Sequence, residues 1–253
     1  MISDIVNDKD QTEFFFRYEF KYILNAETCQ HIESEVSHFM RYDGHVHPEL
    51  KNRYYVTSLY FDSPSSANYY EKIDGLRMRT KFRIRTYAPK FEEGLPTFLE
   101  LKGRCIDRVF KHRIPIRHED LPLFLEPEKS FKLIELYPDN WLIRRFIYEV
   151  ARKKLNPVVL VEYLRRPYTC DFDLNFRATF DSNLKTARSK TLFLNEKGNW
   201  ISPIAGYTIL EIKLHRRIPK WFHKIIQANN LRRLSVSKFC SGMEACNIAI
   251  NLS

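Results

Sequence analysis

Polar and apolar residues alternate along many short stretches of this chain, a period of two that is typical of strands with one buried face. These stretches, together with others that are rich in strand-favouring residues, lie near residues 13–24, 53–62, 79–88, 97–105, 107–116, 157–168, 174–183, 190–194 and 207–214. Helical spacing of apolar residues marks the stretches near 26–40, 64–73, 119–126, 139–154, 218–229 and 237–250. Because the strands are too numerous for a β-α-β order and many are joined by short links, we predict an α+β fold with a mostly antiparallel sheet.

The central predicted strands carry charge on one face and apolar residues on the other. A barrel with a polar lumen and helices packed on its outer wall satisfies both faces, so we predict a barrel that is closed or nearly closed. Trp141 and the apolar residues at 143, 146, 147 and 150 follow helical spacing, and we expect all five to pack against the core. Asn25 or Thr28 is expected to cap the first helix.

A row of bases occupies every odd position from 77 to 85, namely Arg77, Arg79, Lys81, Arg83 and Arg85. In a strand these side chains line one face, because successive residues point to opposite sides. Such a row repels itself unless a polyanion is bound, so it indicates an anion-binding site. The alternative is a solvent-exposed edge strand that its charge protects from further pairing.

The net charge of +10 over 253 residues is concentrated, because residues 77–117 hold twelve Lys or Arg and four Asp or Glu. A local excess favours a polyanion site over a generally basic surface. Five cysteines without a CxxC spacing are typical of a reducing compartment, and no signal peptide is visible. No apolar run nears the roughly 18 residues of a membrane span. We expect a cytoplasmic protein with no transmembrane segment of its own. A membrane-bound partner is compatible with this expectation.

The pattern Glu-x-Lys recurs in three predicted strands, at residues 19 and 21, 100 and 102, and 211 and 213. One copy is what any cross-strand salt bridge produces, whereas three copies beside the basic strand point to a shared lumen. Phosphate loops of the GxxxxGK[ST] and GxGxxG kinds are absent, so side chains must hold any phosphate. Arg and Lys bind phosphate oxygens, while carboxylates can orient these bases or hold Mg²⁺ or Mn²⁺.

These motifs together resemble the catalytic domain of the vacuolar transporter chaperone (VTC) family, which belongs to the triphosphate tunnel metalloenzymes. The resemblance covers about residues 13–246 of a single predicted domain, 1–253, through RYEFKY (17–22), SLYFDS (58–63), KFRIRTY (81–87), FLELKGR (98–104), VEYLRRPY (161–168), RATFDSNL (177–184), LEIKL (210–214) and SVSKFCSG (235–242). It implies an eight-stranded antiparallel tunnel. It also implies a polyphosphate polymerase that moves the γ-phosphoryl group of ATP onto a growing chain, releases ADP and uses Mn²⁺ or Mg²⁺.

The same resemblance implies roles for individual residues. The expected catalytic bases are Arg83, Arg85, Lys102, Arg165 and Lys213. The expected phosphate-binding residues are Lys21, Lys111, Arg177, Ser237 and Lys238, together with Arg113, which shares a predicted face with Lys111. Glu211 is the expected metal ligand, and a purely structural partner of Lys213 is the alternative.

Neighbouring residues receive supporting roles. Strand phase decides between Arg165 and Arg166 as the inward base, and the family pattern favours Arg165. Glu19 and Glu100 are expected to orient bases, and Asp181 is expected to shape the strand or turn near Arg177.

Two positions depart from related patterns. Arg17 stands where the adenylate cyclase and thiamine triphosphatase branch opens with a Glu, which counts against a cyclase or a plain triphosphatase. Ser235 stands where the VTC pattern often has a Lys, so one basic contact is missing.

Two other functions stay open. A hydrolase of tripolyphosphate or nucleoside triphosphates is one, although hydrolysis favours more carboxylates to activate water. A non-catalytic polyphosphate sensor or a nucleic-acid-binding module is the other. Alternation places Phe82 on the face opposite Lys81 and Arg83, which disfavours stacking beside these bases, and we expect no nucleic acid partner.

Overall fold

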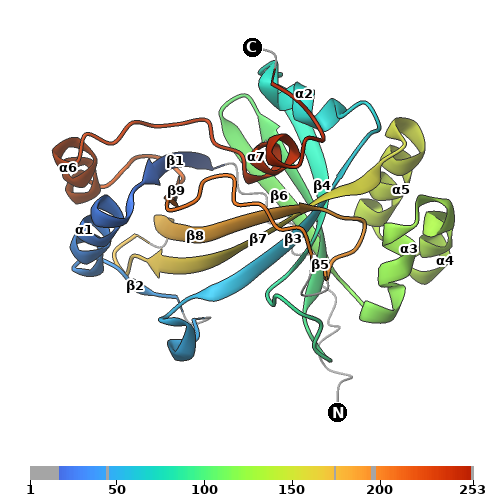
Figure 1. Cartoon of the computed structure of the whole chain (residues 1–253), viewed down its shortest axis with the longest axis horizontal. Coiled ribbons are helices and arrows are strands. Elements are labelled where there is room, and N and C mark those ends of the chain that lie inside the picture. Colours follow the sequence, from blue (N-terminus) through green and yellow to red (C-terminus); the bar gives the residue numbers. More distant parts are fainter. Residues whose placement is uncertain (1–16, 44–45, 174, 195–197, 252–253) are drawn as a thin grey trace.

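The computed structural model of the chain describes residues 17–43, 46–173, 175–194 and 198–251. These residues form one sheet of nine strands: β1 (Tyr18–Leu24), β2 (Arg41–Tyr42), β3 (Tyr54–Asp62), β4 (Met78–Thr86), β5 (Thr97–Cys105), β6 (Arg108–Ile116), β7 (Asn156–Thr169), β8 (Arg177–Arg188) and β9 (Thr208–Leu214). Eight of them follow the path β1-β9-β8-β7-β3-β4-β5-β6, every pair is antiparallel, and the short β2 pairs with β7 beside it. The predicted α+β tunnel fold with eight main strands is confirmed (Figure 1).

The two ends of this path meet at one bridge within the described residues. Arg17 and Val109 exchange two backbone hydrogen bonds, with N···O distances of 3.3 Å from the Arg17 N–H and 3.0 Å from the Val109 N–H. Further along β1, the N–H of Leu234 donates to the carbonyl of Lys21 at 2.9 Å. The sheet therefore curls into a tunnel whose seam lies between β1 and β6.

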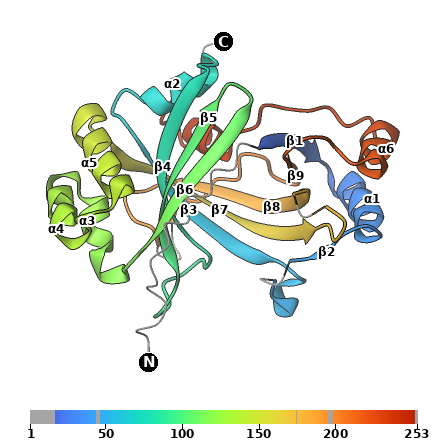
Figure 2. The ribbon, with the colours of Figure 1, turned by 180° about the vertical axis from the view of Figure 1, so that it is seen from behind.

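The helices lie around the curled sheet and at one end of it (Figures 1 and 2). In the described part of the chain they are α1 (Ala26–Ser37), α2 (Ala67–Ile73), α3 (Leu121–Leu125), α4 (Leu133–Leu136), α5 (Trp141–Lys153), α6 (Lys220–Ala228) and α7 (Lys238–Ala245), with short 3-10 turns at Pro48–Leu50, His118–Asp120 and Pro127–Lys132. None of the helices described is long and apolar enough to cross a lipid bilayer.

Three apolar clusters attach these helices to the sheet. One joins α1 and α6 to β1, β7, β8 and β9, with Ile32 and Phe222 fully buried. A second joins α3 and α5 to β3, β4 and β5 around Phe146. The third packs Phe239 and Met243 of α7 against β3, β7 and β8. Each fully buried side chain of this size contributes about 1.5–3 kcal/mol, so these clusters hold the helices against the sheet.

Polar caps fix where two helices begin. The side chain of Asn25 accepts a hydrogen bond from the N–H of Thr28 at 2.8 Å, so Asn25 and not Thr28 caps α1. Asn140 caps α5 in the same way through the N–H groups of residues 142 and 143. The predicted apolar face of α5 is buried except at Trp141, which is 42% exposed at the first helical position and contacts the edge of His112.

The predicted strand at 190–194 is wrong. β8 continues to Arg188, and the chain then turns, with the hydroxyl of Ser189 accepting from the N–H of Thr191 at 3.0 Å. Leu192 is 1% exposed in the cluster around α5, so the apolar run reflects a loop packed on the core. Residues 13–16 of the first predicted strand and residue 174 of the 174–183 strand lie outside the described residues.

Candidate functional site

The inward faces of the strands enclose a cavity of about 1410 Å³. Of the residues that the structure describes, sixteen Lys or Arg line it against three carboxylates, which belong to Glu19, Asp43 and Glu211. This imbalance follows from the sequence, because each strand turns its alternate, charged residues inward. The lumen is therefore a strongly basic tunnel that suits a polyanion.

β4 supplies four of the five bases in the predicted row. Arg79, Lys81, Arg83 and Arg85 line the cavity, whereas Arg77 precedes the strand and is exposed. Phe82 and Ile84, which alternate with them, belong to the outer apolar cluster. The row is thus an inner wall and not a solvated edge, since β4 pairs with β3 on one side and with β5 on the other.

Three lysines stand side by side across β4, β5 and β6. Lys81 lies opposite Lys102, which in turn lies opposite Lys111. Like charges placed directly opposite each other destabilise a sheet, so this row carries a cost in the absence of an anion. Lys102 pairs with Glu19 of β1 at 3.0 Å, while the nitrogen of Lys81 lies 4.5 Å from the ring centre of Phe239. Burial lowers the pKa of Lys81 to about 8.

Glu100 of β5 organises the arginines of β4. Its side chain is fully buried, and its Oε2 accepts from Arg83 Nε at 2.7 Å and lies 3.8 Å from Arg85 Nη1. Lys111 lies 4.0 Å from its other oxygen. Burial alone would raise the pKa of Glu100, but Arg83, Arg85 and Lys111 outweigh it and hold that pKa far below its ordinary value. Glu100 therefore stays charged and fixes both arginines.

Tyrosine hydroxyls continue this network into the lumen. Arg83 donates to the Tyr60 hydroxyl at 2.8 Å, and Arg85 donates to the Tyr163 hydroxyl at 3.4 Å. Burial raises the pKa of Tyr60, but Arg83 and Arg85 more than offset this and lower it to about 8. The two arginines thus have partners on several sides, which limits the directions in which their remaining N–H groups point.

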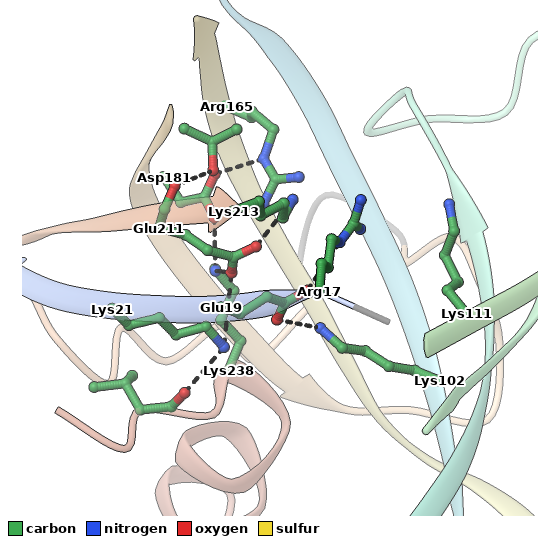
Figure 3. Close-up of polar contacts among 12 residues, drawn as sticks. Arg17, Glu19, Lys21, Lys102, Lys111, Arg165, Asp181, Glu211, Lys213 and Lys238 are labelled. Carbon is green, nitrogen blue, oxygen red and sulfur yellow. Dashed lines mark hydrogen bonds and ion pairs between the residues drawn. The ribbon is translucent and has the colours of Figure 1, made fainter. Parts of the chain in front are cut away.

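Asp181 of β8 binds two cations of the tunnel wall (Figure 3). Arg165 of β7 donates to both of its carboxylate oxygens at 2.7 Å, and Lys238 of α7 lies 2.6 Å from Oδ2. Burial raises the pKa of Asp181, but Arg165 and Lys238 outweigh it and lower the pKa to about 2. This carboxylate therefore ties the last helix to the tunnel wall.

Glu211 of β9 lies among lysines (Figure 3). Its oxygens lie 2.9 Å from Lys213, 3.6 Å from Lys21 and 4.0 Å from Lys238. Burial would raise the pKa of Glu211, but Lys213 and Lys21 hold it well below its ordinary range. In the same cluster, burial lowers the pKa of Lys213 to about 7 although Glu211 opposes the shift.

All twelve residues predicted to be catalytic, phosphate-binding or metal-binding line this one cavity. Arg165 faces the lumen, whereas Arg166 faces away, where it pairs with Glu33 at 2.5 Å. Arg177 is partly exposed and pairs with Asp43 at 2.6 Å. The roles of the twelve residues stay predictions.

The remaining predicted contacts lie near α7 and β6. The Ser237 hydroxyl accepts from the N–H of Cys240 at 3.3 Å and caps α7, which places Lys238 at the first helical position. Arg113 lies with its guanidinium carbon 4.8 Å from the ring centre of Phe98.

Sequence reasoning missed several residues of the site. Asp181 was expected only to shape a strand, yet it holds Arg165 and Lys238. The sequence did contain a signal for Asp181. It lies two residues from Thr179, so both side chains point to the same face of β8, and Thr179 lines the cavity. Lys81 belonged to the basic row without an assigned role, and the contribution of Tyr60 was not foreseen.

The carboxylates Glu211 and Glu19 have the hard oxygens that Mg²⁺ and Mn²⁺ prefer. Among the described residues, no three His, Cys, Asp or Glu side chains are grouped so that they could hold a metal ion. Mg²⁺ is commonly bound by one or two carboxylates together with substrate phosphates. The donor set thus fits an ion shared with a phosphate substrate.

Comparisons with known proteins agree with this geometry. The model of the VTC domain family matches residues 16–247, and no curated protein matches the chain. The solved structure of a putative adenylate cyclase from Bacillus halodurans is similar, with 11% identity, a TM-score of 0.52, and coverage of 88% of this chain and 94% of that one. A putative adenylyl cyclase from Hippeastrum, described as having a dominant triphosphatase activity, is similar with 14% identity, a TM-score of 0.57, and coverage of 91% and 96%. These likenesses show the fold, and the family match shows that the chain belongs to the VTC domain family.

Proposed function

We propose that this chain is a metal-dependent polyphosphate polymerase, which transfers the γ-phosphoryl group of ATP to a growing polyphosphate chain and releases ADP. The observation that carries the proposal is the described lining of the tunnel, with sixteen bases and three carboxylates. Each of these carboxylates is itself engaged by bases, as Glu19 is by Lys102 and Glu211 by Lys213. A long lumen of this charge suits a linear chain of phosphates, and membership of the VTC domain family supports the same substrate class.

The reaction needs no nucleophile from the protein. A terminal oxygen of the polyphosphate chain attacks the γ-phosphorus of ATP, and a new P–O bond forms there. The bond between the γ-phosphorus and the β,γ-bridging oxygen breaks, and ADP leaves with that oxygen. The task of the protein is to align the two polyanions and to stabilise the charge that spreads over the transferring group.

The arginines of the tunnel suit this task because they are already fixed. Arg83 is held by Glu100 and Arg165 by Asp181, so their planar forks require little rearrangement to meet phosphate oxygens. Lys102 and its neighbours across β4 and β6 would hold the chain as point charges.

Glu211, with Glu19 on the neighbouring strand, would hold Mn²⁺ or Mg²⁺, which when bound offsets charge on the phosphate oxygens. The lysines around Glu211 keep its carboxylate charged and therefore ready to accept a cation. Both carboxylates are engaged by lysines, which makes them poor bases for activating water and favours transfer over hydrolysis.

The direct test is to incubate the purified chain with ATP and Mn²⁺, with and without a short polyphosphate primer, and to follow ADP release and chain length on a gel. Long chains with matching ADP are expected. Free phosphate without chain growth would instead assign a triphosphatase, the activity ascribed to the Hippeastrum protein of this fold. Tight binding of tripolyphosphate without turnover would assign a sensor.

Glu211→Ala separates the metal role from polyanion binding. We expect turnover to be abolished, because the carboxylate that would hold the metal is lost. We expect polyphosphate to bind as well as before or better, because Lys21 and Lys213 are released from their partner. Glu135→Ala, an exposed residue of α4, is the matched control. Normal turnover by Glu211→Ala would contradict the metal assignment.

A further inference from the structure

Three aromatic rings form a wall along part of the tunnel. Tyr54 of β3, Tyr87 just after β4 and Phe98 of β5 all line the cavity and are partly buried. The ring centres of Tyr54 and Tyr87 are 5.8 Å apart, and those of Tyr87 and Phe98 are 6.2 Å apart. Inorganic phosphate gains nothing from such rings, because they offer apolar faces in a lumen that otherwise recognises charge.

We propose that this aromatic wall, defined as Tyr54, Tyr87 and Phe98, stacks the base of the donor nucleotide, with its triphosphate directed inward along β4. The inference rests on the proposed function, since it takes a nucleoside triphosphate as the donor. Aromatic side chains stack bases with little regard to their identity, because every base has a π face. The wall would therefore separate nucleotides from inorganic polyphosphates while discriminating weakly between ATP and GTP.

The order of groups along β4 agrees with this orientation. At about 3.3 Å per residue, Arg85 lies about 7 Å from Tyr87 along the strand and Arg83 about 13 Å. Lys81, where the lysine row crosses to β5, lies about 20 Å away. A nucleotide with its base at Tyr87 thus directs its phosphates first to Arg85 and then to Arg83. The growing chain would occupy the lysine row beyond them.

The wall is held in place before any ligand binds. The hydroxyl of Thr57 donates to the carbonyl of Ala88 at 2.8 Å, and that of Thr86 donates to the carbonyl of Pro96 at 3.1 Å. These two hydrogen bonds fix the backbone on either side of Tyr87. A rigid platform loses little conformational freedom on binding, which favours stacking.

The wall is also close to cations that fit a nucleotide. Tyr54 lies opposite Arg165 in the register of β3 and β7. Burial raises the pKa of Tyr54 to about 12, so its ring stays neutral at physiological pH. Arg113 lies over Phe98 and would add a cation near the base or the α-phosphate.

The experiment compares two probes, ATP and inorganic tripolyphosphate, by calorimetric binding to the full chain without turnover. Tyr87→Leu and Phe98→Leu remove a ring while keeping an apolar side chain. We expect each to weaken ATP binding about fivefold or more and to leave tripolyphosphate binding unchanged. Tyr87→Phe keeps the ring and should bind ATP like the parent chain. Phe91→Leu, which removes a 49% exposed ring that stacks on His118, is the control outside the cavity lining.

Two results would overturn the aromatic wall as a base site. One is equal weakening of ATP and tripolyphosphate binding, which would mean that the rings support the tunnel as a whole. The other is unchanged ATP binding in both leucine variants. Failure of the proposed function looks different: if the parent chain binds ATP and makes no polyphosphate, the polymerase is wrong, while the ratio of the two affinities still tests the wall.

Discussion

Replacing Asp181 by Asn tests how much one buried carboxylate contributes to the stability of the tunnel against unfolding. Asp181 is fully buried. Its two carboxylate oxygens each accept a hydrogen bond from the Arg165 guanidinium at 2.7 Å, and Oδ2 lies 2.6 Å from Lys238 Nζ. Asn keeps the shape and one acceptor oxygen but loses the charge, which deprives two buried cations of their nearest negative charge. Breaking a buried ion pair by removing one partner costs about 3–5 kcal/mol. Against the opposing effect of burial, the same two cations lower the pKa of Asp181 to about 2, which agrees in sign with this cost. We therefore expect a loss of about 3 kcal/mol.

Thermal and urea unfolding measure this loss. For a chain of this size, about 3 kcal/mol lowers Tm by about 6–12 °C. Tripolyphosphate supplies negative charge to the same two cations, so it should raise the Tm of Asp181→Asn more than that of the parent chain. Asp139→Asn changes an exposed carboxylate before α5 and should unfold like the parent.

The pH dependence has a defined sign. Because the folded state lowers the pKa of Asp181, its stabilisation is complete above the unfolded value of about 4 and is lost as pH falls through about 2. The Asn variant should lack this part of the acid transition. If Asp181→Asn unfolds at the parent temperature, the buried cations do not depend on this carboxylate and the reasoning fails.

Two further predictions concern polyanion binding. Arg165→Lys should weaken tripolyphosphate binding about tenfold in a titration, because the planar guanidinium is lost. Arg166→Lys should leave this binding unchanged, since Arg166 pairs with Glu33 outside the lumen. Equal effects of the two substitutions would mean that the assignment of Arg165 to the inward face is wrong. Burial lowers the pKa of Lys213 to about 7, so tripolyphosphate affinity should fall as pH rises through that value, and Lys213→Arg should flatten this profile. A profile that Lys213→Arg leaves unaltered would assign the titration to another group.

The inward walls of β4, β5 and β6 could be predicted because alternation along a strand is a local property. Arg83 and Lys102 needed only their own strand to show which way they point. Family resemblance then extended the prediction to Ser237 and Lys238, which lie on a loop and a helix start where no alternation applies.

The rest depended on contacts between distant segments. Asp181 meets Arg165 only because β8 carries one extra residue opposite Tyr163, where the register shifts between Glu162 and Leu164 of β7. It meets Lys238 only because α7 folds back against the sheet. Neither the bulge nor the return of α7 is visible as a local pattern. The run at 190–194 failed for the opposite reason, since its residues favour a strand locally but pack as a loop.

The pairing of β1 with β9 also constrains when the site can exist. These strands, Tyr18–Leu24 and Thr208–Leu214, are separated by roughly 190 residues of sequence. At typical rates of synthesis, β1 leaves the ribosome about 10–40 s before its partner is made. During that interval Lys21 lacks its partner Glu211, and the wall of the lumen lacks β9. A ribosome-bound chain that stops before β9 thus presents an open basic sheet, and selective capture of polyanions begins only after β9 has been made.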